Sequence, residues 1–272
     1  MELKVLGSVS PYPKGDKNGV SNLIIDGDYK ILLDCGPGST RLLNMEDDLN
    51  NLIVIISHLH KDHYADLLAL GYASFVYHNL GYLNKRIPVY IPYGDKIEKE
   101  EHYGSNDNGW GIRTQKVNLP DYEYLKNFGN EHFLEFIDYN SDVELTHGEL
   151  KCEFVSNPHP LNTYSVRVEN GKQSFVYSAD TGFQNNYLIE LADNADLFIC
   201  EATFLKGQNK KIDNHLYAYE AGLIAKEANV KELLLTHFWP GADKQKYVDE
   251  ASDVFKNVHA AEEGKVYKIG GK

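Results

Sequence analysis

The sequence has few cysteines, and the three that it has are not spaced to act together. Cys35, Cys152 and Cys200 lie in or beside apolar runs, and no two of them form a C-x-x-C pair. This spacing argues against a disulfide-stapled scaffold and against a cysteine-ligated zinc ribbon. We expect three buried, reduced thiols that behave as small hydrophobic side chains in a reducing compartment.

The chain also lacks a long apolar run and an excess of basic residues. No stretch approaches the ~20 apolar residues of a membrane-spanning helix, and the first residues predict a strand, not the apolar core of a secretion signal. Lys and Arg number 27 against 40 Asp and Glu, which gives a formal charge of −13. Because proteins that bind nucleic acid neutralise phosphates with Lys and Arg, this balance argues against a large RNA such as tRNA. We therefore expect a cytoplasmic protein with no membrane partner.

Potential metal ligands, in contrast, are concentrated in residues 57–63. His58, His60, Asp62 and His63 follow the apolar run 52–56, which predicts a buried strand. The cluster therefore lies where a strand ends and a loop begins. Imidazole and carboxylate are ligands that Zn²⁺, Mn²⁺ and Fe²⁺ all accept. On an extended backbone His58 and His60 point the same way, which leaves Asp62 and His63 for a second ion.

Three further candidates share this context, because each follows a predicted strand. They are His159, Asp180 and His237. Strand ends that lie side by side would place all seven donors along one edge of a sheet. An open position for a bridging water would then indicate a catalytic, not a structural, site. The expected ligands are His58, His60 and His159 for one ion and Asp62, His63 and His237 for the other, with Asp180 bridging both.

The order of these motifs, His-x-His-x-Asp-His followed by His, Asp and His, resembles the metallo-β-lactamase superfamily. Further stretches resemble its ribonuclease Z branch, and in particular short bacterial hydrolases of that branch. The resemblance implies an αββα sandwich, two divalent ions and a paired Glu201 and His215 beside them. The stretches that carry it are LDCGPG at 33–38, NPHP at 157–160, YSADT at 177–181, CEATF at 200–204 and LLTHF at 234–238.

The resemblance also implies a mechanism. Two cations, preferably Zn²⁺ with Mn²⁺ or Fe²⁺ as alternatives, would convert a bridging water to the hydroxide that attacks phosphorus. Glu201 would hold His215 as the proton donor to the leaving group, and Asp62 or Asp180 would orient the hydroxide. Taken without the resemblance, His215 would equally fit a helix cap and Glu201 a turn carboxylate.

Departures from ribonuclease Z narrow the expected substrate. That enzyme carries a long basic arm between its third-motif histidine and the bridging aspartate. Here residues 160–179 have room only for two strands and a turn at Asn170-Gly171, a strong hairpin signal. The basic residue that follows the last ligand in that family is also missing. The sequence therefore predicts a phosphodiesterase for a small or single-stranded phosphodiester, with a homodimer expected from the resemblance alone.

Two alternatives stay open. The same two ions would also support hydrolysis of a carboxylic ester, thioester, lactone or aryl sulfate. The second alternative is a metal-binding sensor or interaction module with little turnover, because a fold does not fix a function. A missing ligand or a missing proton donor would favour that module, and the sequence shows neither.

The 272 residues are enough for one α/β domain with a large core. Strands and helices alternate in two halves, to about residue 92 and from about 133, which suits a four-layer αββα sandwich. The stretch 93–130 between them predicts a surface loop or a lid that brings Tyr103, Trp110 or Tyr122 over the metals. The expected strands cover 2–7, 21–26, 29–34, 51–56, 133–137, 142–146, 150–155, 163–169, 173–177, 196–200 and 231–235, and the expected helices cover 66–78, 185–193, 216–228 and 243–256.

Overall fold

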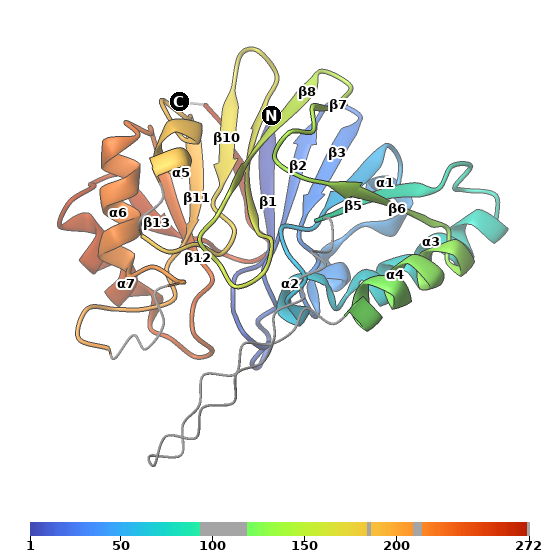
Figure 1. Ribbon diagram of the computed structural model, residues 1–272, viewed down its shortest axis with the longest axis horizontal. Coiled ribbons are helices and arrows are strands. Elements are labelled where there is room, and N and C mark those ends of the chain that lie inside the picture. Colours follow the sequence, from blue (N-terminus) through green and yellow to red (C-terminus); the bar gives the residue numbers. More distant parts are fainter. Residues whose placement is uncertain (93–118, 184–185, 209–213, 271–272) are drawn as a thin grey trace.

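Two β-sheets pack face to face in the computed structural model, which describes residues 1–92, 119–183, 186–208 and 214–270. Helices cover the outer face of each sheet, so the layers run helix, sheet, sheet, helix (Figure 1). This arrangement is the four-layer αββα sandwich that the sequence predicted. No helix among the described residues is long and apolar enough to cross a bilayer.

The first sheet has the strand order β14-β1-β2-β3-β4-β5-β6. It is antiparallel from β14 to β3 and parallel from β3 to β6. All four residues of β4 are buried, as expected for a central parallel strand that is covered on both faces. The strands are β1 (Glu2–Gly7), β2 (Ser21–Asp26), β3 (Tyr29–Leu33), β4 (Leu52–Ile55), β5 (Ile87–Pro92), β6 (Leu134–Tyr139) and β14 (Val266–Lys268).

The second sheet has the order β13-β12-β11-β10-β9-β8-β7. It is parallel from β13 to β10 and antiparallel from β10 to β7. The carboxyl ends of β10, β11 and β12 therefore meet at one edge of this sheet. The strands are β7 (Leu145–His147), β8 (Leu150–Ser156), β9 (Tyr164–Glu169), β10 (Ser174–Tyr177), β11 (Leu197–Glu201), β12 (Leu233–Thr236) and β13 (Val258–Ala260).

Alternating side chains divide the core into three apolar layers. Along β2, Ile24 faces the other sheet, whereas Leu23 faces the helices outside. Along β12, Leu234 faces the other sheet and Leu235 faces outward. Because both faces of each sheet are buried in this way, the strand ends are the natural place for a polar site.

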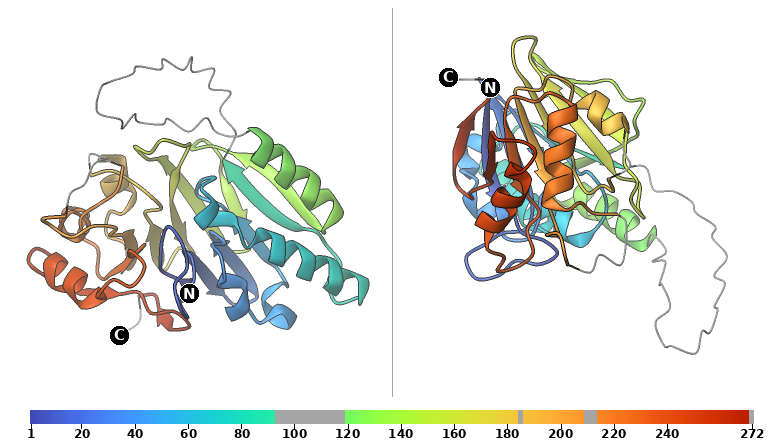
Figure 2. Two further views of the ribbon diagram at one scale, coloured as in Figure 1. Left: turned by 90° about the horizontal axis from the view of Figure 1, so that it is seen from below. Right: turned by 90° about the vertical axis from the view of Figure 1, so that its left-hand side faces the viewer.

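Helices α5, α6 and α7 cover the second sheet, and α3 and α4 cover the first (Figures 1 and 2). Local sequence signals mark where some of these helices begin. The Asp243 side chain caps α7 by accepting a hydrogen bond from the Gln245 backbone N–H at 3.2 Å. The helices are η1 (Ser39–Leu42, a 3₁₀ turn), α1 (Met45–Asp48), α2 (Lys61–Tyr64), α3 (Leu67–Asn79), α4 (Leu119–Glu131), α5 (Asn186–Leu191), α6 (Ala218–Glu227) and α7 (Lys244–Ser252).

Three strands and one longer helix lie where the sequence predicted none. β5 contains two prolines, which disfavour strands, but it is held by parallel pairing to β4 on one side and β6 on the other. β13 and β14 are only three residues long and exist through pairing with β12 and β1. β6, which the prediction placed in the second half, belongs to the first sheet. β7 begins three residues after its predicted start.

The predicted lid or surface loop at 93–130 is described only in its last part. Residues 119–131 form α4, which packs on α3 and β6. Tyr122 is buried there and its hydroxyl donates to Asp138, so the prediction that it stacks over the metals was wrong. Tyr103 and Trp110 lie outside the described residues.

Candidate metal centre

The predicted ligands come together at one edge of the sandwich, each at the end of a strand. β4 leads into the loop of His58 and His60 and then into α2, which contains Asp62 and His63. β8, β10 and β12 lead to the other three. Two groups of side chains result, which we name by one member. The His58 set comprises His58, His60 and His159, the Asp62 set comprises Asp62, His63 and His237, and Asp180 lies next to both.

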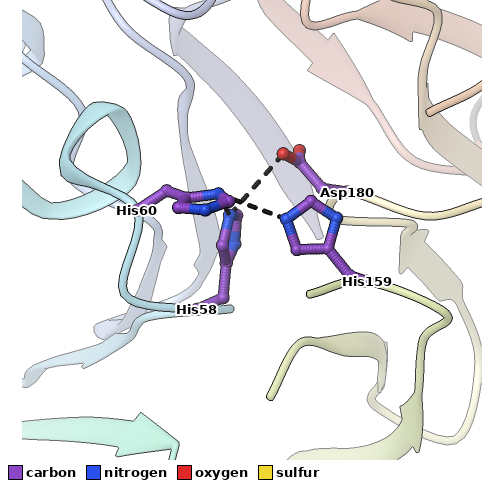
Figure 3. Close-up of side chains that lie close together, drawn as sticks. All are labelled: His58, His60, His159 and Asp180. Atoms are coloured by element: carbon purple, nitrogen blue, oxygen red, sulfur yellow. Dashed lines mark hydrogen bonds and ion pairs between the residues drawn. The ribbon is translucent and has the colours of Figure 1, made fainter. Parts of the chain in front are cut away.

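In the His58 set the ring nitrogens face one another (Figure 3). His60 Nδ1 lies 2.9 Å from His58 Nε2 and 3.2 Å from His159 Nε2. Burial is the main cause that lowers the pKa of all three rings, to about 4 for His159 and well below the usual range for His58. The rings are therefore neutral at neutral pH, and a metal ion binds imidazole in that form.

The Asp62 set also presents unpaired donor atoms to a common point. His237 Nε2 lies 3.0 Å and His63 Nε2 lies 3.4 Å from Asp180 Oδ1. All three atoms are buried, and among the described residues none of them has a hydrogen-bond partner. Leaving such groups unpaired is costly, and a divalent cation between them would satisfy all three. The donor atoms therefore fit a metal ion.

Asp180 connects the two sets. Its Oδ1 faces His63 and His237, while its Oδ2 lies 3.6 Å from His58 Nε2. The carboxyl is almost fully buried, which by itself would raise its pKa. The neighbouring rings, His237 foremost, nevertheless hold the pKa of Asp180 well below its usual range. It is thus a carboxylate with one oxygen directed at each set.

A second carboxylate lies behind the ligands. Asp34, at the end of β3, is fully buried and accepts four hydrogen bonds. Two come from the backbone N–H and hydroxyl of Ser57, one from His63 Nδ1 at 2.7 Å and one from the Tyr177 hydroxyl at 2.7 Å. The Ser57 hydroxyl also lies 3.0 Å from His58 Nδ1. Asp34 therefore holds one ring of each set, and sequence reasoning gave it no role.

Glu201 occupies the corresponding place in the second sheet, at the end of β11. Its Oε1 accepts hydrogen bonds from the Thr181 backbone N–H at 2.8 Å and from His215 Nδ1 at 3.0 Å. Its Oε2 accepts the Thr203 hydroxyl at 2.7 Å, and the same hydroxyl lies 2.8 Å from His237 Nδ1. Burial would raise the pKa of Glu201, but the charge on His215 and the hydrogen bond from it lower the pKa.

His215 lies beside both sets. Its ring stacks on His237 with centroids 5.2 Å apart and meets His159 edge-on at 5.5 Å. Burial would lower its pKa, but Glu201 and then Asp180 raise it to about 9. His215 also forms a third group of possible ligands with Asp180 and His237, although its Nδ1 is engaged by Glu201. It therefore carries a proton at neutral pH, and its side chain is 20% exposed.

Unusual backbone conformations direct several of these residues toward the site. Asp34, Ala179 and His237 have φ values of 58°, 49° and 62°, in the left-handed region that non-glycine residues seldom adopt. Each lies just after a strand, where the kink redirects the chain at Asp34, Asp180 and His237. Such strain persists only where surrounding contacts enforce it, and it is typical of functional sites.

The loops that surround the candidate ligands are in close contact with one another. A Cβ at Gly36 would lie 2.4 Å from the Asp62 carbonyl oxygen, so only glycine fits there. The Ser10 hydroxyl donates to Asp62 Oδ2, and the Ser10 backbone N–H donates to the Phe238 carbonyl at 3.0 Å. The loop after β1 thus connects the Asp62 set to the turn that carries His237.

Sequence reasoning missed the residues behind the ligands, namely Asp34, Thr203, Tyr177 and Ser10. For Asp34 a signal was available, because it follows the apolar strand residues Ile31, Leu32 and Leu33 just as the ligands follow theirs. Ser10 and Thr203 are small hydroxyl residues in loops, and nothing in their local sequence distinguishes them from turn residues.

Comparison with known proteins identifies the family. The model of the beta-lactamase superfamily domain matches residues 29–238. The probable metallo-hydrolase YhfI of Bacillus subtilis is 30% identical over 98% of this chain and 100% of its own length. Its crystal structure superimposes with a TM-score of 0.80, at 29% identity and 98% coverage of both chains.

Two further proteins are similar to this chain. A ribonuclease Z of Archaeoglobus fulgidus is 26% identical over 96% of this chain and 95% of its own. The short form of human tRNase Z has the same fold, with a TM-score of 0.70 at 19% identity and 99% coverage of both chains. The chain belongs to the metallo-β-lactamase superfamily of metallo-hydrolases, in its ribonuclease Z-like branch.

Proposed function

We propose that the protein is a dinuclear metal-dependent phosphodiesterase that acts on a small or single-stranded phosphodiester. One observation carries the proposal: His215, held by Glu201, lies beside two sets of candidate metal ligands that are both in contact with Asp180. Two ligand sets suit an in-line displacement at phosphorus, and a proton donor suits a poor alkoxide leaving group.

The chain would hold one ion on the His58 set and one on the Asp62 set, with Asp180 as the shared ligand. Zn²⁺ is the ion we expect first, and Mn²⁺ or Fe²⁺ would accept the same imidazoles and carboxylates. When bound, two such ions supply Lewis acidity toward phosphate oxygens and lower the pKa of a water molecule so that it becomes a nucleophile.

The protein side chains supply orientation and proton transfer. Glu201 fixes the His215 ring through Nδ1, so its Nε2 is the nitrogen free to donate a proton to the leaving oxygen. Asp62 is held by the Ser10 hydroxyl, and its carboxylate would orient the nucleophile. Both groups contribute positions fixed before substrate binds.

Three observations bear on the substrate. The archaeal relative is a ribonuclease Z, whose name denotes a nuclease for RNA. In this chain, however, residues between His159 and Asp180 form only β9, β10 and their turn, so no arm for tRNA is built there. The charge of −13 also disfavours a long polyanion. A homodimer and a cytoplasmic location remain part of the proposal.

The test combines metal analysis with two phosphodiesters that differ in leaving group. Bis-p-nitrophenyl phosphate releases a phenolate that leaves without a proton, whereas a dinucleotide releases an alkoxide that requires one. His215→Ala should lower kcat for the dinucleotide by about 10²–10⁴-fold. The same variant should lose much less on bis-p-nitrophenyl phosphate and keep its metal content.

Other outcomes point to the alternatives. Turnover of p-nitrophenyl acetate or a lactone without turnover of either phosphodiester would favour a carboxylic ester hydrolase. Two bound ions without turnover of any of these substrates would favour a metal-binding module. A protein that binds no ion would contradict the proposal altogether.

A further inference from the structure

The rings of the Asp62 set are both held from behind by a carboxylate. His63 Nδ1 contacts Asp34 directly at 2.7 Å. His237 Nδ1 contacts the Thr203 hydroxyl at 2.8 Å, and this hydroxyl in turn contacts Glu201 at 2.7 Å. Both rings are buried, with exposed fractions of 0% for His63 and 3% for His237.

These contacts fix which ring nitrogen faces the metal. A carboxylate only accepts hydrogen bonds, so the single proton of the Thr203 hydroxyl is donated to Glu201. The hydroxyl oxygen must then accept a hydrogen bond from His237 Nδ1, which leaves the Nε2 lone pair directed at Asp180. His63 is fixed in the same way by Asp34. Such contacts orient a metal-binding ring and raise its basicity.

The His58 set is held less completely. His58 alone has a carboxylate behind it, through Ser57 at 3.0 Å. His60 turns its Nδ1 to the other rings, and no described residue forms a hydrogen bond to its Nε2. His159 Nδ1 has only a long contact of 3.4 Å to the Asn214 carbonyl. Both rings are also partly exposed, so two of the three imidazoles must lose more freedom when they bind an ion.

The two sets also differ in negative charge, and this difference again favours metal binding by the Asp62 set. The Asp62 set contains a carboxylate of its own besides the shared Asp180, whereas the His58 set contains three imidazoles. A divalent cation gains more from two carboxylates than from one in a buried site. Orientation, burial and charge therefore all favour the Asp62 set.

We propose that the centre is asymmetric: the Asp62 set binds its ion first and tightly, the His58 set binds a second, exchangeable ion, and Thr203 is a positioning residue for the tight site. The inference rests on the proposed two-metal centre but not on the identity of the substrate. It implies that activity follows occupancy of the weaker site, so that the protein would respond to the supply of free metal.

The experiment is a titration of chelator-treated protein with Zn²⁺ in competition with a chromophoric chelator. Wild type should show two affinities at least about tenfold apart. His237→Ala should remove the tight step, and His60→Ala should remove only the weak one. Two equal affinities, or a tight step that survives in His237→Ala and disappears in His60→Ala, would overturn the asymmetry and leave the proposed function intact. Absence of any Zn²⁺ binding would overturn both.

The role of Thr203 has a matched control on the neighbouring strand. Thr236 is also buried, immediately precedes His237, and its hydroxyl has no hydrogen-bond partner among the described residues. Thr203→Val should weaken the tight site about 10–100-fold, whereas Thr236→Val should leave both affinities unchanged. Thr203→Ser keeps the hydroxyl and should restore binding.

Equal losses in Thr203→Val and Thr236→Val would overturn the assignment of Thr203, and so would a Thr203→Ser variant as weak as Thr203→Val. If Thr203→Val does not fold, the comparison of wild type, Thr203→Ser and His60→Ala still decides the order of binding. Thermal unfolding of each variant without metal separates the two effects.

Discussion

The two sheets of the sandwich each place one buried carboxylate behind the candidate metal ligands, and the two carboxylates form the same pattern of hydrogen bonds. Each accepts a hydrogen bond from one histidine directly and reaches a second histidine through a small hydroxyl side chain. Each also comes at the end of an apolar strand, β3 for Asp34 and β11 for Glu201. The first group is Asp34 with His63 and, through Ser57, His58; the second is Glu201 with His215 and, through Thr203, His237.

The difference between them lies in what surrounds the directly bound ring. The side chains that form hydrogen bonds to Asp34 are all buried, and the fourth of these bonds comes from Tyr177 in the opposite sheet. Glu201 instead holds His215, whose side chain is 20% exposed and whose pKa is raised to about 9. The same pattern of hydrogen bonds thus has two uses. In the first sheet it orients two candidate ligands, and in the second it orients one candidate ligand and keeps a proton on an imidazole near solvent.

Removing the charge from each carboxylate should have the largest effect on metal binding, and the effect should differ between the two sheets. Asp34→Asn replaces an acceptor of four hydrogen bonds by an amide that turns donors toward Ser57 and His63, so both ions should be lost. The unpaired buried groups should also destabilise the protein by on the order of 3 kcal/mol. Glu201→Gln should retain the ion of the His58 set and lose the ion of the Asp62 set together with the proton donor.

Metal content by mass spectrometry and urea unfolding after chelation measure both effects. A Glu201→Gln protein that loses both ions, or an Asp34→Asn protein that keeps them, would show that the two carboxylates do not divide the centre in this way. Wild-type protein treated with chelator provides the baseline for stability without metal.

The pH dependence of stability should sharpen the contrast, because only the Glu201 network keeps a partly exposed imidazolium. In metal-free protein the pKa of His215 rises from 6.5 to about 9 against the effect of burial, owing to Glu201. A raised pKa stabilises the folded state fully below 6.5, and this stabilisation is lost as the pH rises through about 9. The shift of the His215 pKa from 6.5 to about 9 corresponds to at most about 3 kcal/mol of free energy of unfolding.

His215→Gln should therefore be less stable than wild type at about pH 6, and the gap should narrow by about pH 10. Urea unfolding in the presence of a chelator at both pH values measures the gap. A gap that stays constant would mean that packing of the ring, not its charge, accounts for the loss.

The convergence of the candidate ligands could be predicted from sequence because each follows an apolar strand. The run Leu52–Ile56 before His58 and the run Leu233–Leu235 before His237 place their ligands at strand ends without any knowledge of pairing. Strand direction then brings these ends to one edge, so local patterns suffice for the first layer of the site. The close approach of Glu201 and His215 was inferred only from resemblance, because the two are distant in sequence and belong to different elements.

The contacts behind the ligands were not predictable in this way. Asp34 is held by Ser57, in the loop after β4, and by Tyr177, which ends β10 in the other sheet. β13 and β14 are likewise short and depend on their neighbours for pairing. Helix α4 is a different case, since Pro120 in its first turn is a helix-start signal that could have been used.

The smallest effect concerns the hydrogen bond that the second sheet donates to the Asp34 carboxylate itself. Tyr177→Phe removes the hydroxyl that donates to Asp34 at 2.7 Å, and Tyr139→Phe removes an equally buried hydroxyl that donates to the Ile56 carbonyl at 2.9 Å. The first should cost about 1–3 kcal/mol, as for a bond to a charged group, and the second about 0.5–1.5 kcal/mol.

Metal binding separates the two tyrosine variants more clearly than stability does. Tyr177→Phe leaves Asp34 freer to move and should weaken both ion sites, because Asp34 holds one ring of each. Tyr139→Phe removes a hydrogen bond to a backbone carbonyl and none to Asp34, and it should leave both affinities as in wild type. If the two variants bind Zn²⁺ equally well, Asp34 is fixed by its own sheet alone, and the contact between the sheets serves packing and not the metal centre.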